Sequence, residues 1–430
     1  MPTEPSARAR MARTFSEVAD ELGPGLVTGA ADDDPSGIAT YSQAGAQFGY
    51  GLLWTMVLTF PLMSAVQLVS AHIGRVTGQG LARNLTSAFP GWIVSSLVSI
   101  LVVANTINIG ADLSAMGASA ELVVGGGRHL FVIGFALLCV GLQLFVPYHR
   151  YARFLKWLTL SLFAYVGVLL VVKTNWNAAV RGMVWPSDVG QSAALTMVAL
   201  FGTTISPYLF FWQSAQEAEE IIDTPGGKAL KDAPASAKQQ FSRMRLDTLA
   251  GMAFSNLIAI AIIMAAAATL HTNGITQIDT ASEAAEALRP IAGPFAFALF
   301  ALGIVGTGML AVPVLAGSAA FAVSETRDWK RGLEYKPRQA VRFYAVIACA
   351  TAVGVALDWL PVDPIRALFW SAVLNGLAAV PIMAAMMIIV GRRSVMGRFK
   401  ATLSLSLFGW SATAVMAAAA AALLVQTAMG

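Results

Sequence analysis

The sequence predicts an all-α integral membrane protein of about eleven transmembrane helices, built from two inverted five-helix repeats in which helices 1 and 6 are broken. Three observations predict this fold class. The 430 residues are 57% hydrophobic and only 12% charged, whereas about 25% of the residues in an ordinary soluble domain are charged. Apolar runs recur along the whole chain. Two of these runs, at corresponding places in the two halves, contain a proline beside polar residues.

A helix needs about 17 to 25 mostly apolar residues to cross a bilayer, and eleven runs meet or approach this length. They lie at about residues 22–48, 51–73, 91–117, 130–147, 154–173, 192–214, 247–270, 291–323, 341–359, 363–390 and 403–428. The eighth run is over-long, so we expect it to begin with an interfacial turn.

Basic residues between these runs predict the orientation, because cytoplasmic loops carry an excess of lysine and arginine. With a cytosolic N-terminus, 23 of the 28 basic residues lie inside. The remaining five are Arg128, Lys173, Arg181, Arg289 and Arg366. An odd number of helices then places the C-terminus outside, and no charged residue follows Lys400.

The same pattern divides the chain into four parts. Residues 1–21 are expected to form a cytosolic tail, because they lack the apolar region and cleavage site of a signal peptide. Residues 22–173 form the first repeat, residues 174–391 the second inverted repeat, and residues 392–430 the eleventh helix and the C-terminus. The polar stretch 215–245 holds too few apolar residues for a core of its own, so we expect a solvated cytosolic loop there.

The first broken helix carries Asp-Asp-Asp-Pro-Ser-Gly at residues 32–37, inside an apolar run. Proline lacks a backbone donor and clashes with the preceding turn, so we expect the helix to open at Pro35 and to restart near Ile38. Free carbonyls and carboxylates at membrane depth are tolerated only where they pack in protein or line a water-filled cavity. This break is therefore a candidate binding site.

The second broken helix carries Gly-Thr-Thr-Ile-Ser-Pro-Tyr at residues 202–208. Pro207 lies near the middle of its run, as Pro35 does in the first. A simple kink at Pro207 is the competing interpretation, because proline is common in membrane helices. Matching interruptions in two inverted halves favour a transporter site at the middle of the bilayer.

The two breaks place oxygen atoms together. The C-terminal end of a helix carries a partial negative charge. A helix that ends at a carboxylate therefore directs both this partial charge and the carboxylate charge at the gap, which favours a cation. We predict Asp34 as the main metal ligand. The other predicted ligands are the hydroxyls of Thr203, Thr204 and Ser206 and the carbonyl oxygens around Thr204 and Ile205. Oxygen ligands suit Mg²⁺, Ca²⁺ or Mn²⁺ better than copper, zinc or iron.

Asp32 and Asp33 cannot share the role of Asp34, because successive helical residues point about 100° apart. We expect them to line a vestibule that attracts cations, or one of them to stay protonated beside its like-charged neighbours. For Asp33 a purely structural role is an equal alternative.

Four motifs open the chain in order: Gly-Pro-Gly at residues 23–25, Asp-Pro at 34–35, Ala-Gly-Ala-Gln-Phe-Gly-Tyr at 44–50 with Leu-Trp at 53–54, and Gly-Arg-Val-Thr-Gly-Gln-Gly-Leu-Ala at 74–82. This set resembles the NRAMP family of divalent metal transporters, and the resemblance extends over essentially all of runs 1–10. It implies a LeuT-type fold of two inverted five-helix repeats, in agreement with the orientation predicted from the loops.

The chain departs from the family at three motifs. The family's Asp-Pro-Gly-Asn is Asp-Pro-Ser-Gly at residues 34–37, which lacks the asparagine ligand. Its Met-Pro-His is Ser-Pro-Tyr at residues 206–208, which lacks the thioether and the histidine linked to proton movement. Its Asp-Leu-Ala-Glu is Asp-Leu-Ser-Ala at residues 112–115, which lacks the glutamate of the proton route. With these three departures the chain resembles the NRAMP-related magnesium transporter branch.

Other polar residues extend the candidate site. Asn108 and Asp112 lie one turn apart on the third run, and an intramembrane carboxylate is functional by default unless it makes a buried structural hydrogen bond. Asn375 on the tenth run is a further predicted ligand, because the corresponding helix of the family often supplies one. Gly37 and Tyr208, beside the two prolines, are assigned to the pathway.

We therefore predict a transporter and not an enzyme. The transporter is expected to import Mg²⁺ and also Mn²⁺ across the cytoplasmic (inner) membrane without proton coupling. The metal is a substrate, and no cofactor is expected. Mg²⁺ is usually bound through one or two carboxylates and retains several waters. Two alternatives remain open. The first is a proton-coupled Mn²⁺ or Fe²⁺ symporter of the NRAMP type. The second is an amino-acid transporter of the same fold, although the three aspartates would repel the carboxylate of an amino-acid substrate.

The partners expected from the sequence are a divalent cation and the lipid bilayer. No basic patch with interleaved aromatics indicates a nucleic acid, and membrane orientation accounts for the net charge of +4. Cys139 and Cys349 lie in separate apolar runs, so neither a disulfide framework nor a zinc site is indicated. The sequence leaves the oligomeric state open and is compatible with a monomer.

Overall fold

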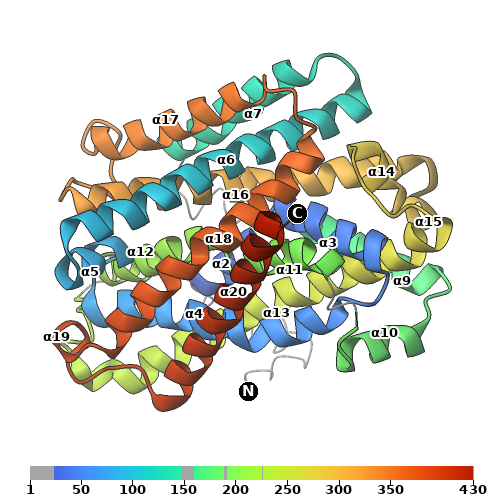
Figure 1. Ribbon diagram of the computed structural model, residues 1–430. Helices are drawn as coiled ribbons and strands as arrows, with labels where there is room; N and C mark the ends of the chain where they lie inside the picture. The colour runs from blue at the N-terminus through green and yellow to red at the C-terminus, as the bar shows by residue number, and fades with distance from the viewer. Residues whose placement is uncertain (1–23, 147–158, 188–190, 225, 430) are drawn as a thin grey trace, which may run out of the picture.

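The computed structural model describes residues 24–146, 159–187, 191–224 and 226–429, and the regular elements in these ranges are helical (Figure 1). The predicted tail at residues 1–21 lies outside them. The first half of the chain contains α2 (Pro24–Asp32), α3 (Pro35–Phe48), α4 (Leu53–Thr77), α5 (Leu81–Ala88), α6 (Gly91–Val124), α7 (Arg128–Phe145) and α9 (Phe163–Val171), with α9 preceded by a 3-10 turn at Thr159–Leu162.

The second half contains more short helices between the long ones. Its α-helices are α10 (Trp176–Val184), α11 (Gln191–Thr204), α12 (Pro207–Asp223), α13 (Ala237–Thr269), α14 (Ala281–Glu286), α15 (Arg289–Ala292), α16 (Ala296–Thr326), α17 (Val341–Leu357), α18 (Pro364–Gly391), α19 (Arg393–Met396) and α20 (Leu403–Met429), and 3-10 turns lie at Pro234–Ser236, His271–Asn273 and Gly293–Phe295. Within the described ranges, eight helical segments are long and apolar enough to cross a membrane, and two shorter apolar helices accompany them.

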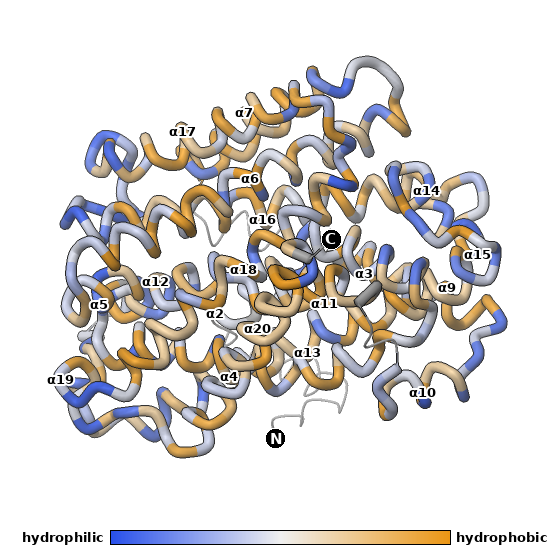
Figure 2. The backbone as a smooth tube through the Cα atoms, in the orientation of Figure 1, coloured by the Kyte–Doolittle hydropathy of each residue, from blue (hydrophilic) through white to orange (hydrophobic). Residues whose placement is uncertain are grey.

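The outer surface of the bundle carries large apolar side chains. Leu130, Phe145, Leu170 and Leu403 are each more than 70% exposed. Figure 2 shows hydrophobic residues along the helices and hydrophilic residues gathered at two opposite ends of the bundle, near α5 and α19 on one side and α14 and α15 on the other. A surface this apolar suits contact with lipid rather than water.

The two broken helices lie at the centre of the bundle. The half-helices α2 and α3 pack on α13, and α11 and α12 pack on α18 and α4. On the opposite side, α6, α7, α16 and α17 pack against one another and form the upper layer in Figure 1. The breaks are therefore enclosed by helices from both halves of the chain.

Glycines allow the broken helices to approach their neighbours closely. A β-carbon on Gly202 of α11 would lie 2.5 Å from the backbone nitrogen of Gly376 in α18. Gly29 of α2 faces the backbone of Gly251 in α13 in the same way. Contact through small residues is the usual means of tight helix packing in membranes, and here it sets the positions of the half-helices.

The polar stretch 215–245 is more helical than the sequence predicts. Helix α12 continues to Asp223 and α13 begins at Ala237, so the loop is confined to the residues between them. Ion pairs stabilise the extension, because Arg75 of α4 pairs with both Glu217 and Glu220 of α12. These partners are distant in sequence, so local polarity alone gave no sign of them.

Candidate functional site

The first break is shorter than predicted. Helix α2 ends at Asp32 and α3 begins at Pro35, so the expected restart near Ile38 is wrong by one turn. The reason is local: proline is already set for the first position of a helix, and Asp34 caps α3. Its Oδ1 accepts a hydrogen bond from the Gly37 N–H at 2.8 Å, which satisfies an otherwise unpaired donor.

The Asp34 carboxylate is surrounded by hydrogen-bond donors from three helices. The Ser36 hydroxyl donates to Oδ1 at 2.6 Å. On the other side, Asn108 Nδ2 of α6 donates to Oδ2 at 3.2 Å. The Tyr208 hydroxyl of α12 lies 3.3 Å from Oδ2 and 2.9 Å from the Ala31 carbonyl, so its single hydrogen serves one of these two acceptors at a time. All four side chains are buried. The structure thus brings Asp34 together with Asn108, Tyr208 and Gly37, which the sequence analysis assigned to the pathway, and with Ser36, which it did not single out.

The second break separates α11, which ends at Thr204, from α12, which begins at Pro207. The Thr203 hydroxyl lies 3.4 Å from the Ser36 hydroxyl. The two breaks therefore meet at these residues, which come from opposite halves of the chain.

The other predicted ligands of the second break face their own helix. The Thr204 hydroxyl donates to the Leu200 carbonyl at 2.9 Å, and the Ser206 hydroxyl donates to the Gly202 carbonyl at 2.8 Å. Their oxygen atoms retain lone pairs that can accept. Ile205 is buried between them, and its N–H donates to the Phe201 carbonyl at 2.8 Å.

A row of amides and a second carboxylate completes this side of the site. Asn375 Nδ2 of α18 lies 3.5 Å from Asn108 Oδ1, and Asn108 Nδ2 lies 3.5 Å from Asp112 Oδ2. Among the described residues, Asp112 Oδ1 and Asn375 Oδ1 have no hydrogen-bond partner. A buried oxygen without a partner costs about 1–3 kcal/mol, so both atoms have the capacity to accept from a water or to bind a cation.

Asp32 and Asp33 face α13 rather than the second break. The hydroxyl of Ser255 lies 2.7 Å from Asp32 Oδ2 and 3.0 Å from Asp33 Oδ1. A hydroxyl has one hydrogen, so it donates to one carboxylate at a time. Sequence reasoning missed Ser255; the polar Ser-Asn pair at residues 255–256 of an otherwise apolar run was the signal that could have found it.

Before the first break, hydrogen bonds hold the half-helix α2 against α12 and α13. Thr28 of α2 donates to Gln213, whose Nε2 donates to Glu217 Oε1 at 3.1 Å. At the start of α2, the Gly25 N–H donates to Asp247 Oδ2 at 2.6 Å. With the candidate ligands buried as well, an ion reaches the site only if these helices move.

One sulfur atom lies near the break, on a residue that the sequence did not single out. A β-carbon on Gly308 of α16 would lie 2.5 Å from Met116 Sδ and 3.3 Å from Pro35 Cγ. Met116 therefore approaches Pro35 across Gly308. Among the described residues, no group of three histidine, cysteine, aspartate or glutamate side chains is arranged to hold a metal.

We expect Ser255→Ala to lower both thermal stability and metal uptake. The change removes the donor that Asp32 and Asp33 share, and an unsatisfied buried acceptor costs about 1–3 kcal/mol. Melting temperature in detergent and uptake into proteoliposomes measure the two effects. Ser255→Thr keeps the hydroxyl and serves as the control; equal losses in both variants would point to packing rather than to the hydrogen bonds.

Comparison with known proteins gives a consistent result. The profile of the family described as natural resistance-associated macrophage protein-like (Nramp) matches residues 25–426. The divalent metal cation transporter MntH of Burkholderia ambifaria is 27% identical over 441 aligned positions, which cover 97% of this chain and 91% of that protein.

Solved structures share the fold. A manganese transporter of Eremococcus coleocola, in complex with an aromatic bis-isothiourea substituted compound, superposes with a TM-score of 0.74 at 16% identity, covering 99% of this chain and 89% of the other. Mhp1, a nucleobase-cation-symport-1 family transporter in a closed conformation, superposes with a TM-score of 0.58 at 14% identity, covering 94% and 91%. The chain therefore belongs to the NRAMP family and has the LeuT-type fold.

Proposed function

We propose that this protein transports divalent metal cations across the cytoplasmic membrane, that it imports Mg²⁺ and also passes Mn²⁺, and that it moves no protons with the metal. The observation that carries the proposal is the Asp34 carboxylate at the meeting point of the two breaks, with oxygen and amide groups around it. We assign Asp34 as the principal ligand. Thr203, Thr204, Ile205, Ser206 and Asn375 are the further candidates.

Selectivity for a hard ion follows from the donor set. One carboxylate, hydroxyls, carbonyls and amides suit Mg²⁺, which is usually bound through one or two carboxylates with several waters retained. Asp112 Oδ1 and Asn375 Oδ1 lack partners among the described residues, and we assign them as acceptors of hydrogen bonds from such waters. Asp32 and Asp33 are proposed to attract cations along the path.

Transport without proton coupling is supported by the residue at position 208. The Tyr208 hydroxyl lies 2.9 Å from the Ala31 carbonyl and 3.3 Å from Asp34 Oδ2, and it donates to one of them at a time. A phenol does not exchange its proton near neutral pH as an imidazole does. An inside-negative potential alone supplies about 4.6 kcal/mol for a divalent ion at 100 mV, which is enough to drive import.

The second candidate function is proton-coupled transport of Mn²⁺ or Fe²⁺. Two observations favour a transition metal as its substrate. The solved relative from Eremococcus coleocola is described as a manganese transporter, and the thioether of Met116, which is a softer donor, lies near Pro35. A thioether that entered the coordination shell would shift preference from Mg²⁺ toward transition metals.

Proteoliposomes with a set membrane potential distinguish the two functions. We expect Mg²⁺ and Mn²⁺ to accumulate, as reported by an entrapped metal indicator, while an entrapped pH dye reports no acidification beyond that of metal-free vesicles. Acidification of the lumen in proportion to metal uptake would refute the uncoupled proposal. Mn²⁺ uptake that excess Mg²⁺ does not inhibit would refute the assignment of Mg²⁺ as substrate.

A further inference from the structure

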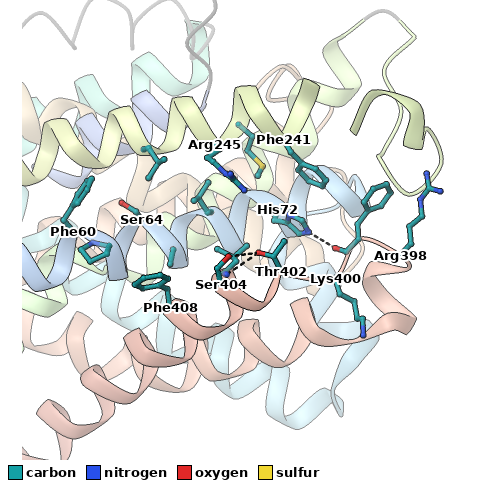
Figure 3. Close-up of a pocket in the computed structure, with 17 residues that line it drawn as sticks. Phe60, Ser64, His72, Phe241, Arg245, Arg398, Lys400, Thr402, Ser404 and Phe408 are labelled. Carbon is teal, nitrogen blue, oxygen red and sulfur yellow. Dashed lines mark hydrogen bonds between the residues drawn. The ribbon is translucent and has the colours of Figure 1, made fainter. Parts of the chain in front are cut away.

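A cavity of about 520 Å³ lies between α4, α13 and the start of α20, away from the candidate metal site (Figure 3). Its volume is in the range of small-molecule binding sites. It opens on the outer surface of the bundle, where Leu246 and Leu403 are 69% and 87% exposed. Since this surface faces lipid, a lipid molecule can reach the cavity directly.

The walls of the cavity are apolar over most of their length. Phe60, Pro61 and Leu68 of α4, Leu249 of α13, and Leu405 and Phe408 of α20 form them. At the end nearest the loop before α20, the His72 ring stacks on Phe241 at 4.7 Å between centroids. Nε2 of His72 lies 2.6 Å from the Phe399 carbonyl. The loop is therefore held in place, and the cavity is a defined feature of the fold.

The rim of the cavity is basic. Arg245, Arg398 and Lys400 line it, and none of its lining residues is an aspartate or glutamate. No ion pair joins these three cations to a carboxylate within the part of the chain that the structure describes. Figure 3 shows Arg245 extending from α13 toward the cavity, whereas the side chains of Arg398 and Lys400, at its edge, point outward. The charge at this rim is complementary to an anion.

A buried hydroxyl points to a ligand with oxygen atoms. Ser64 of α4 is 3% exposed and lines the cavity, and its Oγ has no hydrogen-bond partner among the described residues. At the mouth, the hydroxyls of Thr402 and Ser404 lie 3.2 Å apart at the N-terminus of α20, where the helix dipole favours negative charge. The cavity thus has hydroxyl groups at its mouth, on Thr402 and Ser404, and one hydroxyl group in its apolar wall, on Ser64.

We propose that this cavity binds one anionic phospholipid. The phosphate lies between Arg245 and the start of α20, and the long Lys400 side chain turns inward from the edge of the cavity to meet it. Ser64 donates to an ester oxygen of the glycerol backbone, and the upper acyl chains follow Phe60 and Phe408. Basic pockets between transmembrane helices are known binding places for anionic headgroups. Free phosphate would meet the charges but leave Ser64 and the apolar walls without a partner.

Native mass spectrometry of the full chain tests this proposal. The protein is stripped of lipid and titrated with phosphatidylglycerol, with phosphatidylcholine and with inorganic phosphate. We expect one phosphatidylglycerol per chain, and about 30-fold weaker binding after Arg245→Gln with Lys400→Gln, since each basic residue near an anionic headgroup contributes about a factor of five. Ser64→Ala is expected to weaken binding about fivefold without changing the charge.

The matched control replaces two exposed basic residues that do not line the cavity, Lys238→Gln with Arg393→Gln. Unchanged binding in this control, together with the two expected losses, supports the site. Equal binding of phosphatidylcholine, displacement of the lipid by inorganic phosphate, or an equal loss in the control would each overturn it. Ser64→Ala keeps the test valid if the charge variant does not fold.

Discussion

Asp34→Asn is expected to lower metal uptake by more than about 100-fold while the protein still folds. Two unit charges 4 Å apart attract by about 4 kcal/mol at an effective dielectric constant of about 20, and every 1.4 kcal/mol is a factor of ten. Asparagine keeps the size and an oxygen that can still cap α3 through Gly37. The loss should therefore come from the charge and not from the break in the helix.

Initial rates of Mg²⁺ and Mn²⁺ uptake into proteoliposomes measure this effect, with equal protein incorporation verified for each variant. The control is Asp232→Asn, an exposed carboxylate in the loop between α12 and α13, which should transport as the parent protein does. Uptake by Asp34→Asn at the parental rate would show that the site lies elsewhere.

Gly202→Val is expected to prevent assembly of the bundle. The β-carbon of any replacement would lie 2.5 Å from the Gly376 nitrogen and 2.8 Å from its Cα. These are backbone atoms, which cannot swing aside as a side chain can. Overpacking of a well-packed interior costs about 1–3 kcal/mol and sometimes more, and here it also moves Thr203 away from Ser36.

The yield of monodisperse protein on size exclusion and its melting temperature in detergent check this expectation. Gly134→Val is the matched control, because a β-carbon on Gly134 meets no atom within 4 Å. It should leave both measurements unchanged. A stable, monodisperse Gly202→Val protein would mean that α11 and α18 do not need this close contact.

Local signals in the sequence predicted most of the fold. One further signal, the aspartate followed by proline at residues 34–35, could have predicted where α3 begins. Long apolar runs predicted the transmembrane helices, and the prolines predicted the two breaks. The helices of the structure and its similarity to a solved transporter confirm the predicted fold class. The start of α3 at Pro35 was also readable, since an aspartate followed by proline is a common start of a helix. The helical extensions into residues 215–245 were not readable, because they depend on Arg75, more than 140 positions away.

By itself the sequence determined that this is a membrane protein with two broken helices and a carboxylate at the first break, because composition, proline geometry and residue identity act locally. Only the tertiary structure decided what surrounds that carboxylate. Asn108 and Tyr208 reach Asp34 from 74 and 174 positions away, and Ser255 reaches Asp32 from 223. Such contacts depend on how closely whole helices pack, which glycines such as Gly202 permit and which no periodicity within one helix encodes.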